Sequence, residues 1–331
     1  MGQDHGAAMN RARPGVLPIL IVAVVVAQCI NPAAFAQLAG QPGAFGRMGF
    51  GARGMAMGNA MSAVPTGELA SYYNPALLPF AATRSGSASM GILSLDRSLN
   101  FLSFTMPLPP KAGLAISVIN AGVSKIDGRD GDGEQTGALR TSENQASLGF
   151  AIRFTPVFSA GVNVKLHYYH LYTDVSSTTM GFDFGTFYMI TPELGAAVTV
   201  RNVGSRYKWD TGPLFGQNGQ TSEEAFPQLY TAGLSYQLDD SLGVIDAEIE
   251  FSNKETILAR AGLEMTILPE FSARAGIDRV DLKEKGNGVK PSIGFTFRKP
   301  LGGWTPAVHY AFIIEPFSPT DMHIITVSVA F

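Results

Sequence analysis

The sequence has few charged residues, one cysteine and few long apolar runs. Only 15% of its 331 residues are charged, where about 25% is usual, and the net charge of −3 gives no basic field for nucleic acid. A single cysteine excludes a disulfide framework. A helical membrane protein needs several apolar runs of about 20 residues, and only the N-terminus approaches that length. These absences leave a large secreted β protein or a membrane β-barrel.

The N-terminus has the pattern of a cleaved secretory signal peptide. A positive region with two arginines precedes an apolar run over 16–27, and the A-x-A sequence at 34–36 is a cleavage signal. We therefore expect residues 1–36 to be removed, leaving Gln37 as the first residue. A membrane anchor is disfavoured because the run is short. Lipidation of Cys29 is disfavoured because a bulky glutamine precedes it.

From Ser87 to Phe331 the chain alternates with period two, the pattern of β-strands with two different faces. In 158–172 one face is apolar, with aromatic residues near its ends, and the other is polar. Five such segments carry no acidic or basic residue on the apolar face. Lys or Arg at the midplane of a lipid-facing surface costs roughly 2–4 kcal/mol, which explains that absence.

These strands predict an all-β fold, a transmembrane antiparallel β-barrel over 87–331. A soluble sandwich also alternates, but strands of about ten residues are long enough to cross a bilayer. Connections alternate between short and long, which places both barrel ends in the periplasm of a bacterial outer membrane. The fourteen expected strands are 87–95, 98–106, 112–122, 144–154, 158–172, 177–190, 194–203, 228–238, 244–252, 256–267, 271–280, 289–298, 304–314 and 321–331.

The polar faces carry charges that we assign to the barrel lumen. A tight turn at 268–269 would place Glu264 opposite Arg274 and Arg260 opposite Asp278. The full set of lumen charges is Arg153, Lys165, His167, Asp246, Glu248, Glu250, Arg260, Glu264, Arg274 and Asp278.

The last strand ends in an alternating apolar pattern that finishes with phenylalanine. Ile325, Val327, Val329 and Phe331 share one face. A terminal Phe on such a strand resembles the assembly signal of bacterial outer-membrane proteins. We therefore expect lipid and the outer-membrane assembly machinery to be partners.

Residues 51–78 carry a family resemblance. The motif residues are Gly51, Ala52, Arg53, Met57, Gly58, Ala60, Ala63, Val64, Tyr72, Asn74, Pro75 and Ala76. This pattern resembles the opening of the PorV/PorQ family, relatives of the FadL-type hydrophobic-solute channels. Thr66-Gly67 stands in place of the usual acidic pair, and Leu77 stands where glycine is common.

The resemblance implies that residues 37–86 form a hatch or plug. Its apolar side chains need burial, and its glycines allow close backbone approach. We expect the 74–76 sequence to form the turn that leads into the first strand. A flexible linker is the alternative.

The sequence shows no enzyme chemistry and no cofactor motif. His167 and His170 point to opposite faces of one strand and cannot share a metal. The acidic loop around Asp130 lacks EF-hand spacing, so a solvated loop is favoured over a calcium site. The resemblance implies a partner in type IX-like secretion of cargo proteins to the cell surface. A FadL-like channel for small hydrophobic solutes is the alternative.

Overall fold

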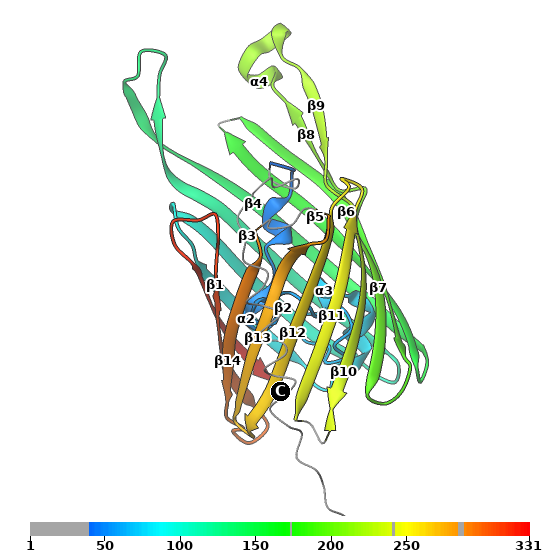
Figure 1. The fold of residues 1–331 in the computed structure, drawn as a ribbon. Helices are drawn as coiled ribbons and strands as arrows, with labels where there is room; N and C mark the ends of the chain where they lie inside the picture. The colour runs from blue at the N-terminus through cyan, green and yellow to red at the C-terminus, as the bar shows by residue number, and fades with distance from the viewer. Residues whose placement is uncertain (1–39, 173, 240–241, 284–287) are drawn as a thin grey trace, which may run out of the picture.

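The computed structural model describes residues 40–331, apart from 173, 240–241 and 284–287. The predicted signal peptide and Cys29 lie outside the described residues. Fourteen antiparallel strands close into one barrel in the order β1-β16-β15-β14-β13-β12-β11-β10-β7-β6-β5-β4-β3-β2 (Figure 1). The predicted fold class is confirmed.

The barrel strands are β1 (Ser85–Ile92), β2 (Arg97–Leu108), β3 (Ala112–Arg129), β4 (Gln135–Thr155), β5 (Phe158–Tyr172), β6 (Val175–Met189), β7 (Leu194–Val203), β10 (Leu229–Leu238), β11 (Gly243–Ser252), β12 (Ile257–Leu268), β13 (Phe271–Asp281), β14 (Lys290–Arg298), β15 (Thr305–Ile313) and β16 (Met322–Ala330). Connections such as 109–111, 156–157 and 269–270 define the short-turn end of the barrel. The other end is the long-loop end.

Alternation along the strands sorts side chains between the outer wall and the interior. Leu148 is 49% exposed on the outer wall, whereas Glu250 is 2% exposed inside. Phe331 stacks on Trp304 at the short-turn end, with ring centroids 5.5 Å apart. The outer surface is therefore an apolar belt with aromatic side chains at its rim. No helix in the described part of the chain is long and apolar enough to cross a membrane.

The long-loop end of the barrel contains β-structure as well as loops. β3 and β4 continue past the barrel as a hairpin, which projects beyond the other barrel strands (Figure 1). The connection between β7 and β10 forms a second two-stranded sheet, β8 (Arg206–Asp210) with β9 (Thr221–Ala225). Helices α4 (Gly212–Phe215) and η3 (Gly216–Asn218) join these two strands.

Short helices before the barrel lie within its interior (Figure 1). They are η1 (Ala44–Arg47), α2 (Gly51–Ala56), α3 (Ala70–Tyr73) and η2 (Pro75–Phe80). We call residues 44–80 the inner segment. Most of its side chains are buried. β1 begins at Ser85, two residues before the expected start of the first strand.

Candidate functional site in the barrel interior

The Asn74-Pro75-Ala76 sequence starts a helix inside the barrel. The Asn74 side chain accepts a hydrogen bond from the Ala76 amide at 2.9 Å and caps η2. Its amide group donates to the Ser62 carbonyl at 2.8 Å and to the Thr186 carbonyl of β6 at 3.2 Å. The expectation of a turn directly into the first strand is wrong. Proline suits the first turn of a helix because its fixed φ matches and its missing N–H costs nothing there.

The inner segment approaches the barrel wall at glycines. A methyl group at Gly161 would lie 2.7 Å from the carbonyl carbon of Pro75, which is an overlap. Comparable overlaps with the inner segment occur on six further strands. The set, which we call the glycine collar, is Gly113, Gly161, Gly185, Gly233, Gly262, Gly276 and Gly294. Single glycines within strands are a signal of close backbone approach that sequence analysis did not use for these positions.

Arg53 of α2 joins the inner segment to β12. Its Nε lies 2.8 Å from Glu264 Oε2 and its Nη2 lies 2.9 Å from Glu264 Oε1, while Nη1 donates to Glu68 at 2.6 Å. Burial would raise the pKa of the Glu68 carboxyl, but the Arg53 guanidinium overcomes this and holds it below its ordinary value. Arg274 donates to the same Glu264 carboxylate from β13. The register pairs Glu264 with Arg274, as the tight 268–269 turn predicts.

A second ion network crosses β7, β11, β12 and β13. Glu250 accepts from Arg201 at 2.6 Å and from Arg260 at 2.9 Å, and Arg260 donates to Asp278 at 2.6 Å. The Asn59 amide of the inner segment also donates to Asp278, at 2.9 Å. A register shift between β12 and β13 accompanies the inward position of Asp278.

Two neighbouring carboxylates of β11 face the inner segment. Glu248 Oε1 accepts hydrogen bonds from the backbone amides of Met61 at 2.8 Å and Ser62 at 2.5 Å. Asp246 is fully buried one inward position nearer the short-turn end. Glu248 therefore holds two backbone amides of the inner segment. No cluster of metal ligands occurs in the described part of the chain.

The remaining predicted lumen residues line β4 and β5. Lys165 forms an ion pair with Asp183 at 2.7 Å and donates to Asn202 at 3.0 Å. His167 is fully buried with its ring 4.8 Å from that of Phe226. Arg153 lies over the Phe80 ring, 5.4 Å from its centroid. All ten predicted lumen residues are inward, but they occupy a filled interior.

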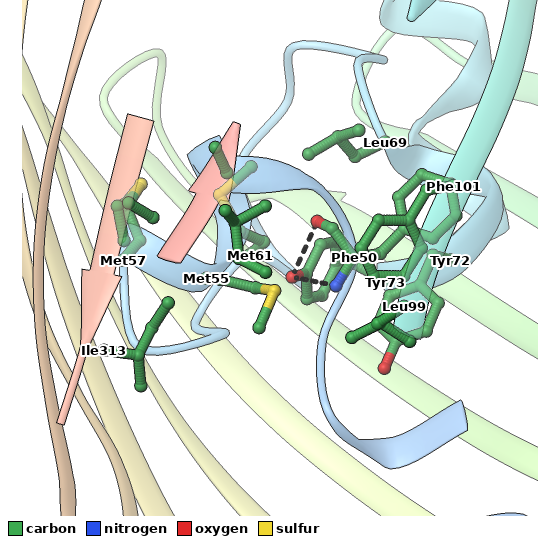
Figure 2. Packing of buried hydrophobic residues seen from close by; sticks show 14 of the residues in the cluster. Phe50, Met55, Met57, Met61, Leu69, Tyr72, Tyr73, Leu99, Phe101 and Ile313 are labelled. Carbon is green, nitrogen blue, oxygen red and sulfur yellow. Dashed lines mark hydrogen bonds between the residues drawn. The ribbon is translucent and has the colours of Figure 1, made fainter. Parts of the chain in front are cut away.

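One wall of the interior is apolar toward the long-loop end. We call this set the inner apolar patch: Leu99, Phe101, Ile119, Ile313, Met322 and Ile324. Phe50 packs against Phe101 with centroids 4.7 Å apart, and Met55 and Tyr72 pack nearby (Figure 2). The sequence did not predict this patch, because the alternation indicated polar inward faces. On β2 the inward Leu99 and Phe101 are followed by the outward Leu102 and Phe104, so the apolar residues change face along the strand.

The β8–β9 hairpin covers another part of the long-loop end. Its Tyr207 and Trp209 pack with Val175, Phe226 and the partly buried Tyr169. The Tyr207 hydroxyl donates to Glu143 at 2.8 Å. Burial, followed by the negative charge of Glu143, raises the pKa of Tyr207 well above its ordinary value. The acidic hairpin tip at Asp130 is exposed and makes local hydrogen bonds to its own backbone amides.

A cavity of about 370 Å³ opens at the short-turn end. We call it the vestibule. Arg53, Glu68 and Glu264 line it on one side, and Arg298 and Gln237 lie on others. The predicted assembly residues Ile325 and Val327 are exposed on the outer wall of β16, at 38% and 51%.

Solved structures share this fold, although no known family model and no curated protein sequence matches the chain. The monoaromatic hydrocarbon channel CymD superposes with a TM-score of 0.63 and 13% identity, over 86% of this chain and 98% of that one. The Pseudomonas putida toluene transporter TodX superposes with a TM-score of 0.58 and 14% identity, over 85% of this chain and 96% of that one. A Pseudomonas aeruginosa FadL homologue superposes with a TM-score of 0.57 and 10% identity, over 91% of this chain and 99% of that one. The chain therefore has the fold of FadL-type outer-membrane channels, and PorV/PorQ membership stays a prediction.

Proposed function

We propose that this protein is a bacterial outer-membrane channel that passes small hydrophobic solutes and catalyses no reaction. Its apolar belt would contact lipid, and its last strand would engage the assembly machinery. With the short turns in the periplasm, both ends of the barrel would be periplasmic. The solute would enter from the long-loop end.

The inner apolar patch carries this proposal. A pore for hydrophilic solutes has a polar interior. Here the wall formed by β2, β3, β15 and β16 presents apolar side chains inward toward Phe50 and Met55. Burial of apolar surface is the general driving force by which such a wall would retain a hydrophobic solute.

The fold comparison supports the same solute class. CymD and TodX are described as a monoaromatic hydrocarbon channel and a toluene transporter. The secretion role implied by the N-terminal resemblance receives no such support. Small aromatic hydrocarbons are therefore the first solutes to test.

Uptake of labelled toluene by intact Gram-negative cells tests the function. Cells that express the protein should take up toluene faster than cells with an empty vector. Ile313→Glu, which places a charge in the inner apolar patch, should reduce uptake, while Phe215→Glu, at a side chain of α4 that is 61% exposed, should not. Equal uptake by expressing and empty cells, with the barrel present and heat-modifiable, would overturn the proposal.

A further inference from the structure

The vestibule contains one arginine that has no ion-pair partner among the described residues. This arginine, Arg298 of β14, lines the cavity, and its Nη2 donates to the Ser272 hydroxyl at 3.1 Å. Its Nε is buried and has no acceptor in the described part of the chain. A guanidinium carries five N–H donors, so most donors of Arg298 are available to another molecule.

The other two arginines of the vestibule are neutralised by carboxylates. Arg53 bonds to both Glu68 and Glu264, and Arg274 shares the Glu264 carboxylate. Among the described residues that line the cavity, three arginines therefore face two glutamates. With histidine counted as neutral, three positive and two negative charges leave a net charge of +1. Arg298 is the arginine that supplies this excess.

Hydroxyl side chains form much of the remaining wall of the vestibule. They are Thr66, Ser85, Thr266, Thr296, Thr305 and Ser328. Hydroxyl groups can donate hydrogen bonds to an oxyanion, while Val244, Ala307 and Ala330 add a small apolar area. A wall of this composition suits a small polar molecule better than a long hydrocarbon chain, which needs an apolar surface on all sides.

The volume and the charge of the vestibule restrict the ligand further. A volume of about 370 Å³ lies at the lower end of the range for small-molecule sites. The planar fork of arginine matches a carboxylate through two parallel hydrogen bonds. One excess positive charge balances a monoanion, whereas a phosphate dianion would leave negative charge uncompensated. The attraction is also less screened in a partly enclosed cavity than on an open surface.

We propose that the vestibule is a binding site for a small monocarboxylate, in which Arg298 holds the carboxylate and the hydroxyl wall surrounds the rest of the molecule. This site goes beyond the proposed channel function, because it requires neither passage of a hydrophobic solute nor movement of the inner segment. The ligand enters from the short-turn end, where the vestibule opens. It lies beside the Arg53 and Glu264 contacts without replacing them.

Calorimetric titration of the purified, folded barrel with benzoate tests this site. Benzoate is a planar monocarboxylate with a small apolar body, and benzamide is an uncharged molecule of nearly the same shape. Benzoate should bind saturably at a single site, and benzamide should not. Arg298→Met removes the charge and keeps an unbranched side chain. It should weaken benzoate binding about 10-fold or more, because hydrogen bonds to a charged group are lost.

Arg153→Met is the matched control for Arg298→Met. Arg153 is also an inward arginine near the short turns, but it lies over the Phe80 ring and does not line the vestibule. Its substitution should leave benzoate affinity unchanged. Arg298→Lys keeps the charge without the planar fork, so its affinity should fall between those of the wild type and Arg298→Met. Heat-modifiable migration confirms that each variant is folded.

The site is overturned if the folded wild type shows no saturable binding at millimolar benzoate. It is also overturned if benzamide binds as well as benzoate, because the charge would then play no part. Equal losses in Arg298→Met and Arg153→Met would indicate a general effect of interior charge and would contradict the proposal as well. Displacement of benzoate by an equal concentration of phosphate would overturn the assignment to a monocarboxylate.

A second comparison applies if Arg298→Met does not fold. Weaker benzoate binding by Arg298→Lys than by the wild type, together with no binding of benzamide, would then support the site, and unchanged binding by Arg298→Lys would overturn it. Binding is measured without transport. Toluene uptake can therefore succeed or fail independently of the monocarboxylate site.

Discussion

Arg53 and Glu264 form a two-point ion pair between the inner segment and the barrel wall. Both nitrogen–oxygen distances are short, at 2.8 Å and 2.9 Å, and both side chains are 10% exposed. Paired geometry of this kind is stronger and more directional than a single contact. The pair therefore holds α2 against the inward face of β12.

Removing one charge of this pair should destabilise the protein. Glu264→Gln leaves Arg53 and Arg274 without their shared carboxylate, and breaking a buried pair costs roughly 3–5 kcal/mol. The midpoint of urea-induced unfolding in lipid vesicles measures this loss. Asp127→Asn, which breaks the exposed pair with Arg129, should change stability by less than about 1 kcal/mol. Similar losses in the two variants would contradict a buried anchoring role.

The glycine collar predicts a second group of sensitive positions. Gly276→Val would force a side chain against the backbone of Met57 and Gly58, so the inner segment should become accessible to protease in the folded barrel. Gly131→Val provides the control, because nothing lies within 4 Å of a side chain there. Limited proteolysis followed by mass spectrometry would locate the cuts. If residues 51–78 stay protected from protease in Gly276→Val, the contact between Gly276 and the inner segment accommodates a larger side chain.

The outer wall gives a prediction that concerns the membrane. Leu148→Arg puts a charge on the apolar belt and should cost roughly 2–4 kcal/mol of folding free energy near the midplane. Leu214→Arg is a comparable exposed leucine in α4, outside the barrel wall, and should have little effect. The folded fraction in vesicles, read from heat-modifiable migration, compares them. Equal folding of the two variants would argue that Leu148 does not face lipid.

The sequence allowed the outer wall and the strand order to be predicted because both follow from local pattern. Alternation specifies which residues share a face, and a tight turn near 268–269 brings Glu264 opposite Arg274, with a register shift between Thr266 and Leu268. It does not specify what covers the inward face. Leu99 and Phe101 are inward because Phe50 and the inner segment cover them, a contact between segments that no period in β2 encodes.

The packed interior also changes what inward polar residues tolerate. Ser147 is 5% exposed and its hydroxyl hydrogen-bonds to that of Ser117 at 2.5 Å. A polar inward face alone would indicate a water-filled lumen in which larger side chains fit. The role of the 74–76 sequence could not be predicted from the local sequence pattern either, because the Asn74 side chain contacts Ser62 and β6.

Tyr207 predicts an alkaline transition of the β8–β9 hairpin. Its pKa is raised by burial and by Glu143, so the folded state keeps this hydroxyl neutral at a pH where the unfolded chain ionises. Its contribution to stability is therefore complete below about pH 10, the ordinary tyrosine pKa, and is lost as the pH rises above it. Trp209 lies in the same cluster and is 7% exposed. In a Trp304→Phe background, which leaves Trp209 as the one tryptophan, its emission should shift to the red above that pH.

Tyr207→Phe is the control for this transition. It removes the titrating hydroxyl, so the alkaline shift of Trp209 emission should disappear or move to higher pH. It also leaves Glu143 without the hydrogen bond, which should cost roughly 1.5–3 kcal/mol at neutral pH. If the alkaline shift is identical with and without the Tyr207→Phe substitution, another group governs the transition and Tyr207 does not hold the hairpin in place.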